Sequence, residues 1–312
     1  MINRTFDRKN IIIARVQEDD VNSFLIDLDI DDNGKPLYQL DEFTRAVINT
    51  IPEYVFAEYE NPKIPRTDAV EKLREAARSI YKINDYELMR RWYLDNDKSV
   101  EEEIKKLGGS RRGEFGELIL HLLLRDFKNT IPLISKVYFK DSIGIPAHGF
   151  DAVHITPNDG ILWLGESKFY TDSKRGIREL IGDLENHFKR EYLDEQFLII
   201  KKNVENNSIP YRDEWIKKLT QCNKLSDRLK TINIPLLCTY PHDIYKLYNS
   251  LDEKEAIEYH EKNIRELKTY FDEQNNHPLK NKLNVILLLF PIKNKRELII
   301  KLHEKLWHMQ NM

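Results

Sequence analysis

Two strand-like runs, GFDAVHI and ILWLGESKF, flank a short turn between residues 149 and 169 and constrain the fold more than any other stretch. Asp159-Gly160 is a strong turn signal between them. If the loop separates Thr156 from Ile161, the antiparallel register of the whole hairpin is fixed. The sequence therefore predicts a β-hairpin with one defined pairing.

This register brings three ionisable side chains to one end of the hairpin. Asp151 lies opposite Glu166, and Lys168 shares that face because alternate residues of a strand point the same way. Nearer the turn the same face carries only apolar side chains, namely Val153, Ile155, Leu162 and Leu164. A slip of one residue would move Asp151 to the opposite face, so the prediction is sharply defined.

Two carboxylates and an ammonium at the open end of a hairpin suit metal-dependent phosphodiester cleavage. Mg²⁺, or Mn²⁺ in its place, prefers oxygen ligands and is usually held by one or two carboxylates plus substrate phosphate. We expect Asp151 and Glu166 to be ligands, together with the backbone carbonyl of Ser167. Lys168 would orient or help to deprotonate the attacking water and stabilise the transition state. The alternative is an ordinary surface pair of Glu166 and Lys168, worth less than ~1 kcal/mol.

The helix expected at 111–127 adds a further acid. Glu114, Glu117 and His121 share one face of this helix because of their spacing. We expect Glu117, in preference to Glu114, to reach the carboxylate cluster on the hairpin. The alternative is a solvated acidic face near a helix N-terminus, where the helix dipole favours acids.

The order of expected elements indicates an α/β fold, with a mixed sheet flanked by helices. A small α+β module at 1–95 is expected to precede a larger domain at 96–312 with helical elaborations at its C-terminal end. The strands are expected at 11–16, 24–30, 133–139, 149–155, 161–169, 197–202, 235–240 and 284–290. The helices include 41–59, 97–107, 111–127, 173–190 and 295–309, together with one whose apolar stripe is Val70, Leu73, Ala77 and Ile80.

Composition excludes several classes of protein. The chain of 312 residues has a formal net charge of −3, so it is not a globally basic nucleic-acid coat protein. The apolar stretch at 285–290 is too short to span a bilayer, and no secretory signal is visible at the start. Two cysteines, Cys222 and Cys238, exclude a disulfide framework or a four-cysteine zinc site. We expect a cytoplasmic protein.

The helix glutamate, Asp151 and the Glu166-x-Lys168 pair at a strand end resemble the PD-(D/E)XK, or restriction-endonuclease-like, superfamily. More closely, RGEFGELILHLLL, GFDAVHI and LWLGESKFY are similar to the nuclease subunit (HamA) of Hachiman anti-phage defence systems. The resemblance covers about residues 100–200 by motif and most of the chain by the order of its elements. Phe150 departs from the superfamily pattern, because it stands where the name of that pattern has proline.

The resemblance implies a metal-dependent deoxyribonuclease with Asp151, Glu166, Lys168 and Glu117 at its site. It also implies a superfamily-2 helicase partner (HamB), which would release the nuclease to degrade DNA without sequence specificity. One alternative keeps the fold but drops catalysis, which leaves a DNA-binding or scaffolding subunit. Another is a stand-alone restriction-type endonuclease, which would give discrete cleavage products.

Basic residues at two helix starts would border such a site, where phosphates approach. The candidates for DNA contact are Lys174, Arg175 and Arg178 after the hairpin, and Arg111 and Arg112 before Glu117. Basic residues are also ordinary on helix surfaces. His154 is expected to face away from the acids and to serve the core, while His148 is expected in a loop. The last helix is expected to pack in the core, with a partner interface as the alternative.

Overall fold

The computed structural model describes residues 11–56, 67–81, 86–93, 95, 97–100, 102–103, 113–134, 149–156, 160–206, 212–221 and 224–312. The strands are β1 (Ile12–Gln17), β2 (Val21–Ile26), β3 (Leu28–Ile30), β4 (Pro36–Tyr38), β5 (Ile131–Ile134), β6 (Ala152–Thr156), β7 (Ile161–Phe169), β8 (Ile232–Pro241) and β9 (Asn284–Ile292). The helices are α1 (Leu40–Ile48), α2 (Ile51–Phe56), α3 (Ala69–Ile80), α4 (Tyr86–Tyr93), the 3₁₀ helix η2 (Lys98–Val100), α6 (Gly113–Phe127), α8 (Ser173–His187), α9 (Arg190–Asn206), α10 (Arg212–Gln221), α11 (Leu225–Leu229), α12 (Ile244–Leu247), α13 (Lys254–Gln274) and α14 (Lys295–Gln310).

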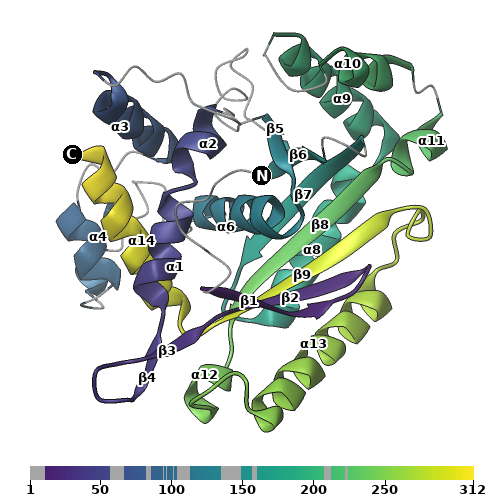
Figure 1. Ribbon diagram of the computed structural model, residues 1–312. Coiled ribbons are helices and arrows are strands. Elements are labelled where there is room, and N and C mark those ends of the chain that lie inside the picture. Colours follow the sequence, from purple (N-terminus) through teal and green to yellow (C-terminus); the bar gives the residue numbers. More distant parts are fainter. Residues whose placement is uncertain are drawn as a thin grey trace.

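One mixed sheet of seven strands, in the order β1-β2-β9-β8-β7-β6-β5, forms the centre of the molecule (Figure 1). Strands β2, β9, β8 and β7 run parallel to one another, whereas β1 pairs antiparallel with β2 on one side, and β6 and β5 continue the sheet beyond β7 in antiparallel pairs. Strands β3 and β4 make a separate two-stranded sheet. The predicted mixed sheet flanked by helices is confirmed.

The strands from the start of the chain take part in the same sheet as those from its end. Strand β2 pairs with β9, with Val21 opposite Leu287. The helices α1 and α3 pack against α14 near the other end of the chain (Figure 1). The expected division into 1–95 and 96–312 stays a prediction.

The β6–β7 hairpin has the predicted register. Thr156 lies opposite Ile161, and the pairing continues without a slip to Ala152 opposite Gly165. The two faces of the hairpin meet different helices. Val153 and Leu164 pack in one core with residues of α8, whereas Ala152 packs in another core with residues of α6. The side chains of β7 therefore alternate between two helical layers.

Helix α6 lies unusually close to β7, and glycine allows this on both sides of the contact. A Cβ added to Gly116 would lie 3.1 Å from Ser167 Oγ. A Cβ added to Gly165 would lie 2.9 Å from Leu120 Cδ2 and 3.0 Å from Pro235 Cγ. Any side chain at Gly165 would push α6 and β8 apart, because both neighbours are packed core atoms.

The strand expected at 197–202 is wrong, because this stretch belongs to helix α9. The residues Leu193, Phe197, Ile200 and Val204 are buried at helical spacing, whereas Leu198 is exposed. A short apolar run does not by itself distinguish a strand from a buried helix. The longer window reveals the helical period.

The single helix expected at 41–59 is instead two helices over its described part, α1 and α2, separated at residues 49–50. Pro52 has no N–H to donate to the carbonyl of Ile48, so an unbroken helix would lose that hydrogen bond. Thr50 Oγ1 donates to the Val47 carbonyl at 2.7 Å and satisfies part of the end of α1. Of the helix expected at 97–107, the structure describes residues 97–100, of which Lys98–Val100 form η2, and residues 102–103. The strand expected at 133–139 is described only as far as Ile134.

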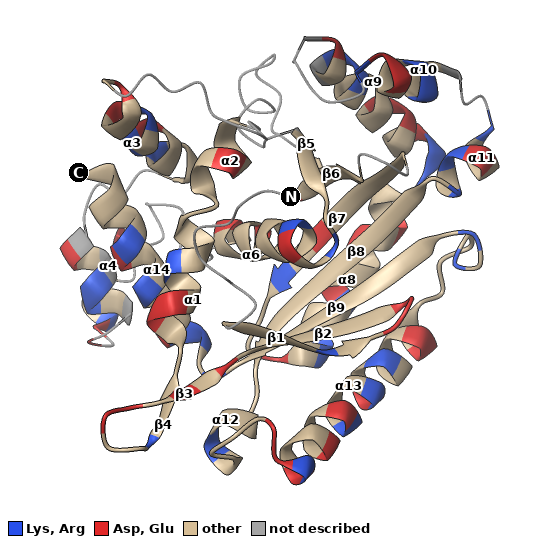
Figure 2. Cartoon of the chain, viewed as in Figure 1, with Lys and Arg blue, Asp and Glu red and all other residues tan. Residues whose placement is uncertain are grey.

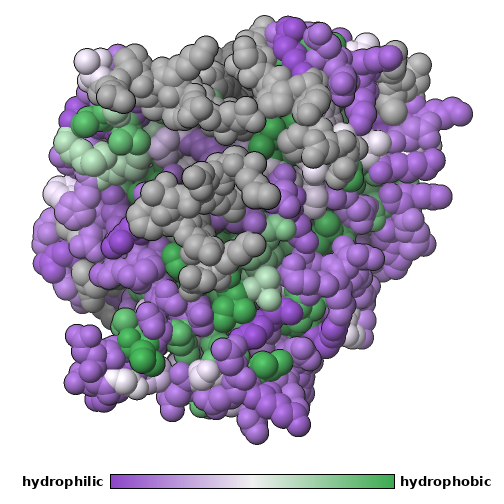
Figure 3. All heavy atoms as spheres, in the orientation of Figure 1, coloured by the Kyte–Doolittle hydropathy of each residue, from purple (hydrophilic) through white to green (hydrophobic). Residues whose placement is uncertain are grey.

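Charge is confined mainly to the helices and loops, while strands β8 and β9 carry no charged residue (Figure 2). On the face in Figure 3, hydrophilic residues predominate and hydrophobic ones are scattered between them. Among the described helices, none has the length and apolar character needed to cross a membrane. Against this background, Glu166 and Lys168 are conspicuous as the charged residues of β7.

We expect Gly165→Ala to lower the free energy of unfolding by about 1–3 kcal/mol, because the new methyl group overpacks the α6–β7 contact. Gly182→Ala in α8 is the matched control, since no atom lies within 4 Å of the added Cβ. That control should be neutral or stabilise by about 0.5–1 kcal/mol. Urea unfolding of the two variants measures the difference, and equal stability would contradict the close contact.

Candidate active site

A cavity of about 480 Å³ opens at the carboxyl end of β7. Four of the residues predicted for the site line it: Glu117 from α6, Asp151 just before β6, and Ser167 and Lys168 from β7. These residues come from three separate segments of the chain. The hairpin and α6 therefore bring two carboxylates and an ammonium to one cavity, but Glu166, which was expected to lie beside Asp151, does not line it.

Asp151 is oriented by its neighbour across the hairpin. Its Oδ2 accepts hydrogen bonds from the backbone N–H and from the hydroxyl of Ser167, both at 2.9 Å. Two donors on one carboxylate oxygen fix the plane of the group. Ser167 thus positions Asp151, a role that the sequence did not indicate for its side chain.

Glu117 is nearly sealed from solvent, with 6% of its surface exposed. The buried hydroxyl of Tyr54 on α2 donates to its Oε2 at 2.8 Å. Burial, and then the adjacent charge of Glu117, raises the pKa of Tyr54 well above its usual value, so the phenol keeps its proton. Glu114 does not line the cavity, which favours Glu117 as the helix carboxylate.

Lys168 pairs with a carboxylate from the helix behind the sheet. Its Nζ lies 2.5 Å from Asp183 Oδ2 on α8. Burial lowers the pKa of Lys168, but Asp183, with added charge from Glu166 and Asp151, outweighs burial and raises that pKa. The ammonium is therefore charged at neutral pH. Of the two roles expected for Lys168, a charged ammonium favours stabilisation of negative charge in the transition state over deprotonation of the attacking water.

Glu166 faces the same helix and does not line the cavity. It is 3% exposed, and its Oε1 lies 2.6 Å from Nδ1 of His187 on α8. The ring of His187 is stacked on Tyr192, with centroids 4.6 Å apart. The residues Asp183 and His187, one helical turn apart, thus hold the two ends of the Glu166-x-Lys168 pair.

The cavity offers two carboxylates that suit Mg²⁺, but no third metal-binding side chain beside them among the described residues. Asp151 and Glu117 supply two carboxylates, and Mg²⁺ commonly takes one or two from protein. Among the residues that the structure describes, no group of three or more His, Cys, Asp or Glu side chains is placed to hold a metal ion. The ligand roles of Glu166 and of the Ser167 carbonyl stay predictions.

The basic residues predicted to contact DNA divide into two groups. Arg175 lines the cavity. Lys174 and Arg178 instead approach Tyr270 on α13, with Lys174 Nζ 5.2 Å from the ring centroid and an Arg178 N–H donating to the hydroxyl at 2.7 Å. Arg111 and Arg112 lie outside the described residues.

His154 faces away from the acids, as predicted. It is buried, and its Nε2 lies 3.1 Å from Nδ1 of His121 while Nδ1 lies 2.8 Å from Thr130 Oγ1. Burial, reinforced by the charge of Arg125, lowers the pKa of His154 to about 3. This histidine is neutral and belongs to the core. His148 lies outside the described residues.

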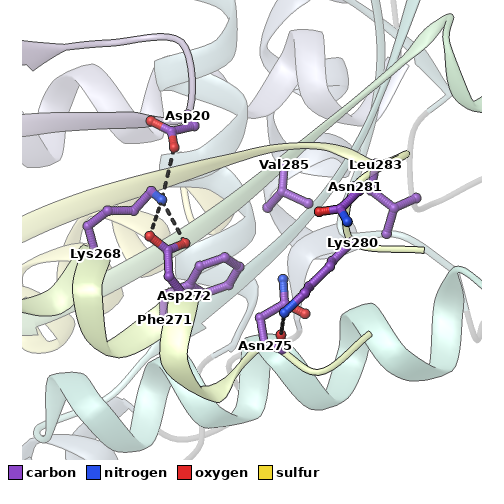
Figure 4. Close-up of a pocket in the computed structure, with 9 residues that line it drawn as sticks. All are labelled: Asp20, Lys268, Phe271, Asp272, Asn275, Lys280, Asn281, Leu283 and Val285. Carbon is purple, nitrogen blue, oxygen red and sulfur yellow. Dashed lines mark hydrogen bonds and ion pairs between the residues drawn. The ribbon is translucent and has the colours of Figure 1, made fainter. Parts of the chain in front are cut away.

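A second cavity, of about 310 Å³, lies between α13 and the start of β9 (Figure 4). Its central cation, Lys268, lies 2.9 Å from a carboxylate oxygen of Asp20 and 2.6 Å from one of Asp272. Lys280 Nζ donates to the Asn275 carbonyl at 3.3 Å. The cations in this cavity have protein partners, and none of the predicted site residues lines it, so the cavity at β7 remains the candidate active site.

Sequence reasoning missed Tyr54, Asp183, His187, Tyr170 and Lys295, all of which contact or line the site. Asp183 and His187 could have been predicted, because their spacing of four residues places them on one face of the helix expected after the hairpin. Tyr54 and Lys295 carried none, since they lie far from the motif in the sequence.

The low pKa of His154 should make stability depend on pH. The unfolded histidine titrates near 6.5 and the folded one at about 3, so this contribution is complete above pH 6.5 and is lost as pH falls toward 3. We expect about 2 kcal/mol of the free energy of unfolding to be lost through His154 between pH 7.5 and pH 5. Urea unfolding of the wild type and of His154→Gln at both pH values measures this.

The variant His154→Gln should have a shallower pH dependence than the wild type. His308→Gln, at an exposed position, is the control and should leave the dependence unchanged. An identical slope in His154→Gln would show that His154 is not held neutral in the folded chain.

The comparisons with known proteins add one match. No curated protein matches the chain. A family model named HamA matches residues 3–306, which is nearly the whole chain and includes α6, the hairpin and α8. The match extends well beyond the stretch that carries the sequence motif. The chain belongs to the HamA family.

Proposed function

We propose that this chain is the nuclease effector of a Hachiman anti-phage defence complex. It would be a metal-dependent deoxyribonuclease of the PD-(D/E)XK kind that degrades DNA without sequence specificity when a superfamily-2 helicase partner releases it. HamA membership associates the chain with antiviral defence. The observation that carries the nuclease proposal is the meeting of Glu117, Asp151 and Lys168 in one cavity.

Asp151 and Glu117 would hold a Mg²⁺ ion, with water molecules, substrate oxygens or a further protein oxygen completing its ligands. When bound, the ion would activate a water molecule and offset charge on the phosphate. The hydrogen bonds from Ser167 to Asp151 and from Tyr54 to Glu117 hold these carboxylates in place. Such outer hydrogen bonds commonly tune metal affinity.

Lys168 supplies positive charge at the same cavity. Because Asp183 keeps its pKa raised, the ammonium can stabilise the negative charge that builds on the phosphate during hydrolysis. Glu166, one strand position earlier on the same face, is proposed as a further ligand.

A second candidate function also has a specific observation in its favour. Glu166 and Lys168 each have a partner on α8, and among the described residues no cluster of three metal-binding side chains is formed. On this alternative the chain is a catalytically inactive DNA-binding or scaffolding subunit of the same kind of complex. Metal-dependent cleavage distinguishes the two.

We expect the chain, assayed alone and with its helicase partner, to cleave linear DNA with Mg²⁺ or Mn²⁺ but not with EDTA. Asp151→Asn and Lys168→Ala should each lower the cleavage rate on the order of 10²-fold or more. Lys230→Ala, an exposed lysine away from the cavity, is the control. Cleavage that persists in EDTA or in both site variants would refute the assignment, and no cleavage under any condition would support the inactive subunit.

The structure also separates the two helix acids. Glu117→Gln should lower cleavage on the order of 10²-fold and abolish the stabilisation of the fold by Mn²⁺, because a ligand is lost while the amide can still accept from Tyr54. Glu114→Gln should leave both properties close to wild type, since Glu114 does not line the cavity. Thermal unfolding with and without Mn²⁺ measures the second property, and the reverse result would assign the role to Glu114.

A further inference from the structure

We propose that Lys295, Arg175 and Lys168 form a phosphate-binding subsite that takes a backbone phosphate of DNA beside the proposed metal site. The proposal rests on the proposed nuclease function but adds Lys295, which no motif assigns, and joins it to Arg175 and Lys168 in one site. The three cations come from α14, α8 and β7 and line the same cavity as Asp151 and Glu117. Its volume of about 480 Å³ lies within the range of roughly 300–1,000 Å³ that is usual for ligand sites.

Lys295 is held in the cavity by three contacts of its ammonium group. Its ammonium donates to the backbone carbonyl of Phe169, and it lies 4.9 Å from the centroid of the Phe169 ring and 5.7 Å from that of Tyr170. An ammonium has three N–H donors, and the carbonyl takes one of them. Burial lowers the pKa of Lys295, because the charged form of the side chain loses hydration in the cavity.

Arg175 approaches the same tyrosine. Its guanidinium carbon lies 5.3 Å from the centroid of the Tyr170 ring, and its backbone N–H donates to Asp172 at 2.7 Å in the N-terminal cap of α8. A guanidinium over an aromatic ring still directs N–H groups outward in its plane, where they match two phosphate oxygens. Tyr170 therefore lies close to two cations from different helices.

The charge balance of the cavity favours a phosphodiester over a purely cationic ligand. Two carboxylates suit a metal ion, and the three cations suit the anion that must lie next to that ion during hydrolysis. Lys174 and Arg178, by contrast, are engaged with Tyr270 and do not line the cavity. Among the described basic residues of this region, the structure therefore selects Arg175 and Lys295.

The test is binding of a fluorescein-labelled DNA duplex to the full chain in EDTA, measured by anisotropy over a series of salt concentrations. EDTA prevents metal-dependent cleavage, so the measurement is independent of it. We expect Lys295→Ala and Arg175→Ala each to weaken binding about 3- to 10-fold and to reduce the slope of log K against log salt by about 1. Lys295→Arg should restore the slope.

Two further variants separate charge from folding. Lys295→Met keeps an unbranched apolar side chain but removes the charge, so it should bind as weakly as Lys295→Ala while unfolding at the wild-type temperature. Lys293→Ala is the matched control, because Lys293 is exposed two residues earlier and does not line the cavity. Lys293→Ala should keep the wild-type slope of log K against log salt. If Lys295→Met has the same slope as Lys293→Ala, the subsite is refuted.

Competition distinguishes the source of the phosphate. A deoxynucleoside monophosphate or inorganic phosphate should displace the duplex only at concentrations far above those of unlabelled DNA. If a mononucleotide competes as well as DNA does, and Lys295→Met abolishes that competition, the ligand is a free nucleotide and the assignment to DNA fails. If the Lys295 and Arg175 variants have a reduced slope of log K against log salt but the chain cleaves no DNA, the subsite is supported and only the nuclease proposal is refuted. If the chain cleaves DNA but the variants keep the wild-type slope, the nuclease proposal is supported and the subsite is refuted.

Discussion

The close packing of α6 against β7 is the constraint on which the candidate site depends. A Cβ at Gly165 on the strand would lie only 2.9 Å from Leu120, and one at Gly116 on the helix would lie 3.1 Å from Ser167, so glycine at both positions lets the two backbones approach closely. At this distance Glu117, one residue after Gly116, reaches the cavity that Asp151 and Ser167 also line. A wider separation would leave the helix carboxylate and the hairpin carboxylate in different environments.

The alternation of side chains along β7 then divides the site between two layers. Ser167 lies toward α6, where it positions Asp151, and its neighbours Glu166 and Lys168 lie toward α8, where His187 and Asp183 meet them. The two layers meet at the end of β7, because the chain continues from Phe169 through Tyr170 directly into the start of α8. The cavity therefore forms where the sheet stops, with the two acids and Lys295 on the side of α6 and α14, and Lys168 and Arg175 on the side of α8.

This arrangement explains why a chain with a net charge of −3 can still suit a nucleic acid. Charge that matters for binding is local: Lys168, Arg175 and Lys295 line the cavity, while most other charges lie on the helices and loops (Figure 2). The residues Tyr54, Ser167 and Asp183 each position a charged group of the cavity through one or two hydrogen bonds or an ion pair. Such outer contacts are as much a part of the site as the groups they hold.

The sequence by itself determined the features that depend on local pattern. The hairpin register followed from the turn at Asp159-Gly160 and the period of two, so the shared face of Val153 and Leu164 could be predicted. The strand at 197–202 could not, because a short apolar run fits both a strand and a buried helix until packing decides. Tertiary structure alone brought Lys295, Tyr54 and His187 to the site and turned Glu166 toward α8. Contacts between residues so far apart in the chain depend on how layers pack, and no local spacing encodes that.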